Sequence, residues 1–255
     1  MPTKSFRVRE RFRSFRDMGP LAPLRFRLER RTADHQRVYD SAAPLVSICI
    51  ATYNRAKLLR GRSLTSVLEQ TYKNIEIIVV GDGCTDETAE MMAEVKDERV
   101  RFENLPQRGT YPEDPHLRWM VAGTAATNRA LSLASGDFIT HLDDDDEHSA
   151  DRIEKLVATI QKTRTDLVYH PFVYETADGA WLRNEAEDFL VGRVTTSSIL
   201  YHRTFKTLGW DPQAYRYREP GDWNRLRKIR YLGARTVRHP DLLLKHYKER
   251  NQTQT

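Results

Sequence analysis

Four consecutive aspartates and a glutamate, at 143–147, are the residues of this sequence best suited to chemistry. They follow a short β-branched and aromatic run, 138–142, which begins after Gly136 and is typical of a buried strand. Ligands of open α/β sheets bind just beyond the carboxyl ends of the strands. Clustered carboxylates there repel one another unless a cation neutralises them, and hard oxygen ligands suit Mg²⁺ or Mn²⁺ shared with substrate phosphates. A solvated acidic loop that caps the next helix is the alternative interpretation.

The acidic run lies within a repeating pattern of apolar runs and helical stripes, between residues 45 and 165. Its predicted strands are Leu45–Ala51, Ile75–Val80, Arg99–Phe102 and Asp137–Asp143. We expect a helix after each strand, including one over about 117–134 and one that Ser149 opens as its N-cap. This alternation predicts an α/β fold with a doubly wound, mainly parallel sheet and helices on both faces.

The second half of the chain, residues 166–255, is less regular. We expect strands at 166–174, 197–202, 235–238 and 242–247, a hairpin turn at Asp178-Gly179, and a helix opened by Gly221-Asp222-Trp223. We therefore expect one domain over residues 44–255. Its first half, 45–165, is expected to bind a nucleotide, and its second half, 166–255, to shape an acceptor site.

The positive charge of the chain belongs to an N-terminal arm, residues 1–43. The whole chain has 41 basic and 36 acidic residues, whereas the arm has 11 basic and 5 acidic ones, so its net charge is +6 and the rest carries −1. Nucleic-acid-binding domains usually carry an excess of positive charge, so the near-neutral charge of residues 44–255 argues against nucleic-acid binding by this domain. Because Val8, Phe12 and Phe15 have helical spacing among arginines, the arm predicts a basic amphipathic segment on an anionic membrane or a partner. A helix that packs Phe12 and Phe15 on the domain, or a disordered arm, is the alternative.

The cysteine content and the hydropathy pattern bear on location. Cys49 and Cys84 are too few for a disulfide framework or a zinc site and suit a reducing cytosol. No apolar run approaches the roughly 20 residues that span a bilayer, and no signal-peptide core is present at the N-terminus. We expect a cytoplasmic protein, with peripheral contact at the inner face of the membrane through residues 1–43.

Several motifs in register carry a family resemblance: 46–55, 66–72, 79–88, 128–137 and Asp143-Asp144-Asp145-Asp146. Together they resemble the family 2 glycosyltransferases, inverting enzymes of the GT-A fold that use nucleotide-activated sugars. The resemblance covers about 45–160 densely and then thins to 208–210 and Gly221-Asp222. Each motif alone is weak, but the set in order and at family spacing is specific.

The resemblance implies roles at the donor site. Thr52 and Tyr53 are expected to border the nucleobase, with Tyr53 stacked on its face, although a packed loop aromatic is an equal alternative. Asp82 is expected to accept a hydrogen bond from the base. The family usually has two acidic residues here, and Gly81 replaces the first. Uracil, guanine and thymine all stay open as the base.

The resemblance also assigns the acidic run. Asp143-Asp144-Asp145 fills the family's Asp-x-Asp position, so Asp145 is expected to bind Mn²⁺ or Mg²⁺, Asp143 the ribose or a metal-bound water, and Asp144 the sugar. Asp146 suits the following helix equally well. His246 is expected at the metal or diphosphate, against the alternative of a satisfied structural histidine.

An inverting displacement needs a carboxylate that takes the proton of the acceptor hydroxyl. The resemblance implies that this carboxylate lies at the start of a helix well after the metal motif, a place that Asp222 matches, so Asp222 is the expected base. Glu219 is its rival, and a helix cap is the alternative role of Asp222. We therefore expect a metal-dependent inverting glycosyltransferase, with a UDP-sugar donor and a glycan, lipid-linked or small-molecule acceptor. A sugar nucleotidyltransferase and a non-catalytic glycan-binding or assembly subunit are the rivals. The first normally has a glycine-rich basic loop, which residues 52–56 do not provide.

Overall fold

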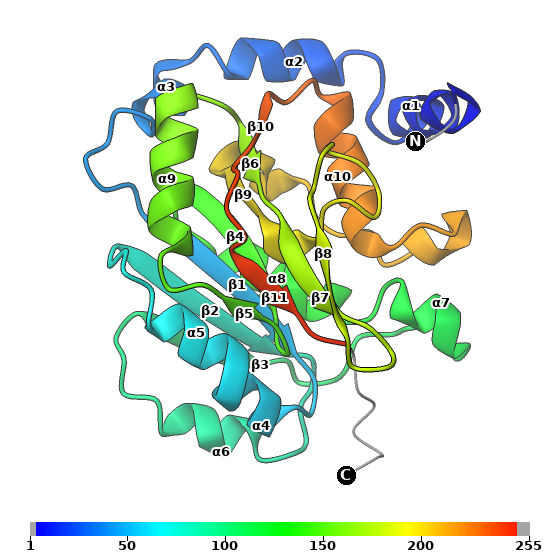
Figure 1. Cartoon of the computed structure of the whole chain (residues 1–255). Helices are drawn as coiled ribbons and strands as arrows, with labels where there is room; N and C mark the ends of the chain where they lie inside the picture. The colour runs from blue at the N-terminus through cyan, green and yellow to red at the C-terminus, as the bar shows by residue number, and fades with distance from the viewer. Residues whose placement is uncertain (1–3, 249–255) are drawn as a thin grey trace.

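A seven-stranded sheet forms the centre of the computed structural model, which describes residues 4–248 (Figure 1). Across the sheet its strands are β10 (Thr236–Arg238), β6 (Leu167–Tyr169), β9 (Ile199–His202), β4 (Phe138–Asp143), β1 (Val46–Thr52), β2 (Ile75–Gly81) and β3 (Val100–Asn104). β9 runs antiparallel to β4 and β6, and the other neighbours pair in parallel. The predicted mainly parallel α/β sheet is confirmed.

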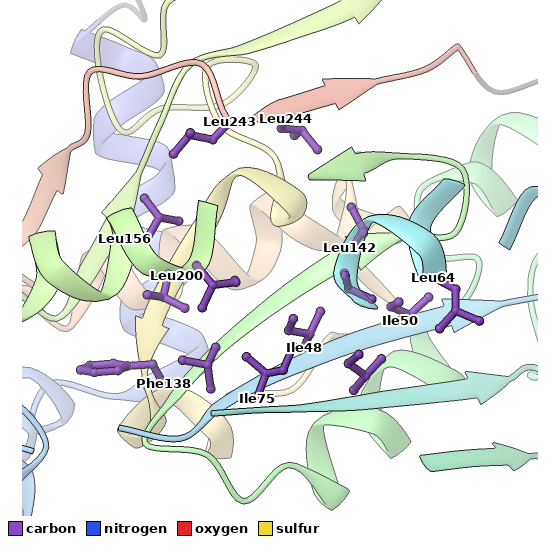
Figure 2. Packing of buried hydrophobic residues seen from close by; sticks show 14 of the residues in the cluster. Ile48, Ile50, Leu64, Ile75, Phe138, Leu142, Leu156, Leu200, Leu243 and Leu244 are labelled. Atoms are coloured by element: carbon purple, nitrogen blue, oxygen red, sulfur yellow. The ribbon is translucent and has the colours of Figure 1, made fainter. Parts of the chain in front are cut away.

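Helices cover both faces of this sheet because its central strands are apolar on both sides. One face is covered by α4 (Ala56–Leu58), the π-helical turn η1 (Leu59–Leu64), α5 (Thr65–Leu68), α6 (Thr88–Ala93) and α9 (Arg152–Thr163). The other is covered by α8 (Thr124–Leu133) and α10 (Gly221–Tyr231). Successive strand residues alternate between the two cores: Ile48 and Ile50 belong to the first and Cys49 to the second. Figure 2 shows the first core, where side chains of β1 and β4 face Leu64 and Leu156.

A second, four-stranded sheet has the order β5 (Glu147–His148), β11 (Leu244–His246), β7 (Phe172–Glu175) and β8 (Trp181–Asn184). β11 pairs antiparallel with β5, so that Lys245 lies opposite Glu147. This pairing brings a C-terminal segment beside the acidic run that follows β4. The predicted hairpin turn is confirmed, since β7 and β8 pair antiparallel and Gly179 has a φ of +82°.

The N-terminal arm contains three helices, α1 (Lys4–Met18), α2 (Ala22–Glu29) and α3 (Ala33–Arg37), at one end of the molecule (Figure 1). Gly19, with a φ of +78°, separates the first two. The remaining short elements are α7 (Pro115–Trp119) and the 3₁₀ turns η2 (Thr196–Ser198), η3 (Arg203–Thr207) and η4 (Ala214–Tyr217). Within residues 4–248, no helix is both long and apolar enough to cross a bilayer.

Three local predictions were wrong. The single helix over about 117–134 is two helices, because Gly123 adopts a left-handed conformation, with a φ of +76°, just before α8. The single strand over 166–174 is two strands in different sheets, and Pro171, which has no N–H to donate, lies between them. Ser149 does not cap α9, which begins at Arg152; its hydroxyl donates instead to Asp151.

Candidate active site

A cavity of about 600 Å³ opens at the carboxyl ends of β1 and β4. All eight side chains that the sequence analysis assigned to the site lie on its walls: Thr52, Tyr53, Asp82, Asp143, Asp144, Asp145, Asp222 and His246. The strand registers explain part of this gathering, since Ala51 pairs with Asp143 and Thr52 with Gly81, so three strands end at one edge. β11 supplies His246, and the first turn of α10 supplies Asp222.

Asp144 and Asp145 are held by an arginine that the sequence analysis missed. The Arg55 Nη1 atom lies 3.0 Å from Asp144 Oδ1 and 3.1 Å from Asp145 Oδ2. The Thr52 hydroxyl donates to Asp144 Oδ2 at 2.7 Å. Burial raises the pKa of Asp144, whereas Arg55 and Thr52 act against that increase. Arg55 ends the motif 46–55 that contributes to the family resemblance and follows the expected base-binding residues in the same turn, so the sequence signal for it was its place in that motif.

Asp143, Asp146 and His246 form a candidate cation site, because one ligand atom of each lies within 4.8 Å of the others. For Asp146, a role in the site and a role in the following helix were equally expected. Asp146 is buried and lies beside Asp143 and His246. Its Oδ2 atom lies 2.8 Å from His246 Nδ1, and its Oδ1 atom accepts the Tyr247 backbone N–H at 3.0 Å. Such a carboxylate–histidine pair fixes the ring orientation of a ligating histidine. Two carboxylates and an imidazole fit a divalent cation such as Mn²⁺.

The electrostatics of the acidic run indicate uncompensated negative charge. Asp143 is open to the solvent of the cavity but enclosed by protein on its other sides; this enclosure, with the nearby carboxylates, raises its pKa to about 7. Burial and the two preceding aspartates likewise raise the pKa of Asp145 to about 7. Burial disfavours the charged form of His246 and is the largest single influence on its pKa. The hydrogen bond to Asp146 and the negative charges of Asp146, Asp143 and Asp145 together outweigh it and raise the pKa of His246 to about 9. A bound cation would relieve the repulsion among these carboxylates.

The wall beside Tyr53 includes residues of the loop 105–114, which follows β3. The Asp82 carboxylate is buried and accepts hydrogen bonds from the Gly109 N–H at 3.0 Å and the Tyr111 hydroxyl at 2.8 Å. The Arg108 guanidinium lies over the Tyr53 ring, 3.8 Å from its centroid. The aromatic face expected to stack on a base is therefore part of a cation–π pair.

The structure distinguishes Asp222 from its rival Glu219. Asp222 is the second residue of α10 and lines the cavity, and its Oδ1 atom accepts the Trp223 backbone N–H at 2.6 Å. The residue before α10 is Pro220, so Asp222 is not its N-cap. Burial raises the pKa of Asp222. Glu219 is buried outside the cavity lining, and each of its carboxylate oxygens forms an ion pair, with Arg13 at 2.7 Å and Arg227 at 2.8 Å.

Comparison with known proteins identifies the family. The model of "Glycosyl transferase family 2" matches residues 47–112 and 116–228. The chain belongs to this family. Among its relatives, the glycosyltransferase GlyG of Streptococcus pneumoniae is 31% identical over 160 residues, which are 61% of this chain and 49% of GlyG. This glycosyltransferase thus spans about half the length of that relative.

Solved structures show the same fold for this glycosyltransferase. Staphylococcus aureus TarS, residues 1–349 in complex with UDP-GlcNAc, superposes with a TM-score of 0.64 at 19% identity over 81% of this chain and 59% of TarS. The mannosyltransferase PcManGT of Pyrobaculum calidifontis, in complex with GDP-Man and Mn²⁺, gives 0.57 at 16% identity over 91% and 66%. The predicted GT-A fold and membership of the family 2 glycosyltransferases are confirmed.

Proposed function

We propose that this glycosyltransferase moves a sugar from a nucleoside diphosphate sugar to a hydroxyl group of a glycan, lipid-linked or small-molecule acceptor, with inversion and with a divalent cation. The observation that carries the proposal is the division of one cavity: the acidic run and His246 occupy one part, and Asp222 enters separately from α10. The first part suits a diphosphate with its cation, and the second suits a general base.

The donor base would lie along Thr52, Tyr53 and Asp82, at the ends of β1 and β2. Arg108 covers the Tyr53 ring, so a stacked base must displace the guanidinium or stack beyond it. We favour a UDP-sugar because TarS, with the higher of the two TM-scores, was solved with UDP-GlcNAc. PcManGT was solved with GDP-Man, and a GDP-sugar is therefore included in the test.

The cation would be held by Asp143, Asp146 and His246, with Asp145 as the further ligand that the Asp-x-Asp motif implies. When bound, Mn²⁺ or Mg²⁺ offsets the charge of the leaving diphosphate. Asp144, bound to Arg55 and Thr52, keeps the turn after β1 against the acidic run. Asp143 also borders the place expected for the ribose.

Asp222 would act as the general base. The acceptor hydroxyl attacks the anomeric carbon from the side opposite the diphosphate, the bond to the diphosphate breaks, and the hydroxyl proton passes to an Asp222 oxygen. Because Oδ1 already accepts the Trp223 N–H, Oδ2 is the oxygen left for this proton. Trp119 lines the cavity and is 57% exposed, so its ring offers an apolar face to an acceptor sugar.

A donor-hydrolysis screen tests the proposal. UDP-, GDP- and dTDP-sugars are incubated with the protein and Mn²⁺, beside the variants Asp143→Asn and Asp222→Asn and the control Glu90→Gln, an exposed carboxylate of α6. We expect one donor class to release its nucleoside diphosphate, both site variants to lose the release, and the control to keep it. If no donor is hydrolysed and none binds more tightly with Mn²⁺, the proposal is wrong and the non-catalytic glycan-binding subunit takes its place.

A further inference from the structure

Helix α1 turns its polar side towards the protein and its apolar side outwards. Glu10 and Ser14 are buried, whereas Val8, Phe12 and Phe15 are 67%, 68% and 45% exposed. At about 100° per residue, the three apolar side chains fall within an arc of roughly 60°, opposite the buried pair. The alternative in which Phe12 and Phe15 pack on the domain is therefore wrong.

Helix α10 explains why the polar side is buried. The Trp223 indole N–H donates to Glu10 at 2.6 Å, and Arg227 donates to Ser14 at 3.0 Å and to Asp17 at 2.7 Å. These bonds satisfy groups that would be costly to bury alone. The polar contacts of α1 with α10 thus set the orientation of α1, and this orientation leaves Phe12 and Phe15 exposed on the surface.

Apolar side chains are also exposed on α2 and at Leu21, the residue before it. Phe26 packs into the domain, whereas Leu21, Leu24 and Leu28 are each more than half exposed. Their spacing of three and four residues places them on one side of the helix. Figure 1 shows α1 and α2 at the same end of the molecule. We call the three exposed side chains of α1 the apolar face: Val8, Phe12 and Phe15.

A groove of about 1000 Å³ lies beside the apolar face, between α1, α2 and α10. Phe12, Phe15, Pro20 and Pro23 line it together with several arginines. Elongated apolar side chains or acyl chains fit such a groove. Of its arginines, Arg11 and Arg27 are exposed and Arg227 is buried.

Exposed arginines of α1 flank the apolar face: Arg9, Arg11 and Arg16. Further exposed arginines lie on or just after α2: Arg25, Arg27 and Arg31. By helical position, Arg11 lies on one side of the Val8–Phe12–Phe15 stripe and Arg9 and Arg16 on the other. Guanidinium groups beside an apolar stripe can reach lipid phosphates while the apolar side chains enter the acyl region. A second copy of this chain would bring arginines against arginines, which is unfavourable. An anionic surface complements the charge.

We propose that the apolar face docks this glycosyltransferase on the surface of an anionic lipid bilayer. The buried bonds between α1 and α10 then hold the helix that begins beside Asp222 in a defined position relative to the membrane. The docking concerns surface binding alone, so it does not depend on the proposed donor or on turnover.

Vesicle co-sedimentation of the full chain tests the docking. Vesicles of phosphatidylcholine alone are compared with vesicles that also contain phosphatidylglycerol. We expect binding to the anionic vesicles, and a loss of about tenfold or more in the double variant Phe12→Ser/Phe15→Ser, because two aromatic side chains no longer leave water. Arg9→Gln/Arg11→Gln should also weaken binding to the anionic vesicles, by about tenfold.

Matched controls change exposed residues elsewhere. Leu182→Ser removes a 47% exposed leucine of β8, and Arg101→Gln an exposed arginine of β3; neither should alter vesicle binding. Unchanged thermal unfolding would show that the variants are folded, as their exposure predicts. The proposal is overturned if the wild type ignores anionic vesicles or if the arm variants bind as the wild type does. It is equally overturned if light scattering shows a dimer that depends on Phe12 and Phe15 and no lipid binding.

Discussion

Asp222 and Glu219, three residues apart, should respond in opposite ways to loss of their charge. Asp222 lines the cavity, and Glu219 is buried between Arg13 and Arg227. We predict that Asp222→Asn lowers the rate of donor turnover and leaves stability nearly unchanged. Glu219→Gln should lower stability and leave the rate of the folded enzyme intact.

The structure gives the expected magnitudes. A positioned general base contributes about 100- to 10,000-fold to a rate, so Asp222→Asn should lose a factor in that range. Breaking a buried ion pair costs about 3 kcal/mol or more, and in a chain of this size about 3 kcal/mol lowers Tm by roughly 6–12 °C. This cost applies to Glu219→Gln because the Glu219 and Arg227 side chains are only 7% and 1% exposed.

The assay is nucleoside diphosphate release from the donor found in the screen, with Mn²⁺, beside thermal unfolding and a titration of UDP or GDP. Asp222→Asn should bind the nucleotide within about threefold of the wild type, since the base does not touch the donor's nucleotide. The assignment is refuted if Asp222→Asn keeps the wild-type rate, or if Glu219→Gln loses the rate at an unchanged Tm.

Three further predictions concern the same cavity. Asp143→Asn should remove the Mn²⁺-dependent part of nucleotide affinity, by about tenfold or more, in calorimetry with and without Mn²⁺; equal affinities in wild type and variant would exclude Asp143 as a ligand. Tyr53→Ala should weaken nucleotide binding by about 1–3 kcal/mol if a base stacks on the ring, and an unchanged Kd would contradict stacking. Because burial raises the pKa of Asp222, turnover should fall as pH drops through that raised value, and this acidic limb should be absent from the residual rate of Asp222→Asn.

The site residues that the sequence could predict are those at the carboxyl ends of strands. Thr52, Asp82 and Asp143 each follow an apolar run, and parallel strands end at one edge, so their proximity followed from local pattern. His246 was placed at the site by the family resemblance, at the end of a predicted late strand. The described residues confirm these positions in one cavity.

Other parts of the site depend on contacts between distant residues. Asp146 belongs to the site because β5 pairs with β11, about a hundred residues later, and brings His246 against it. Arg108 and Tyr111 lie in a loop without periodicity, so nothing local indicated that they would cover Tyr53 and bind Asp82. The periodicity of hydrophobic residues predicts helices and strands, whereas these contacts depend on how the loops pack against the folded sheet.

The N-terminal arm contacts the domain through bonds that composition did not indicate. Its charge and its prolines separated residues 1–43 from the domain, yet Glu10 is buried against Trp223, the neighbour of the proposed base. Glu10→Ala would leave the indole N–H buried without its acceptor, at a cost of about 1–3 kcal/mol, and would loosen the start of α10. We therefore predict a lower Tm and slower donor hydrolysis in Glu10→Ala, but not in Glu90→Ala, an exposed glutamate of α6. If Glu10→Ala and Glu90→Ala have the same Tm and the same rate of donor hydrolysis, the contact between Glu10 and Trp223 supports neither the stability of the domain nor the position of Asp222.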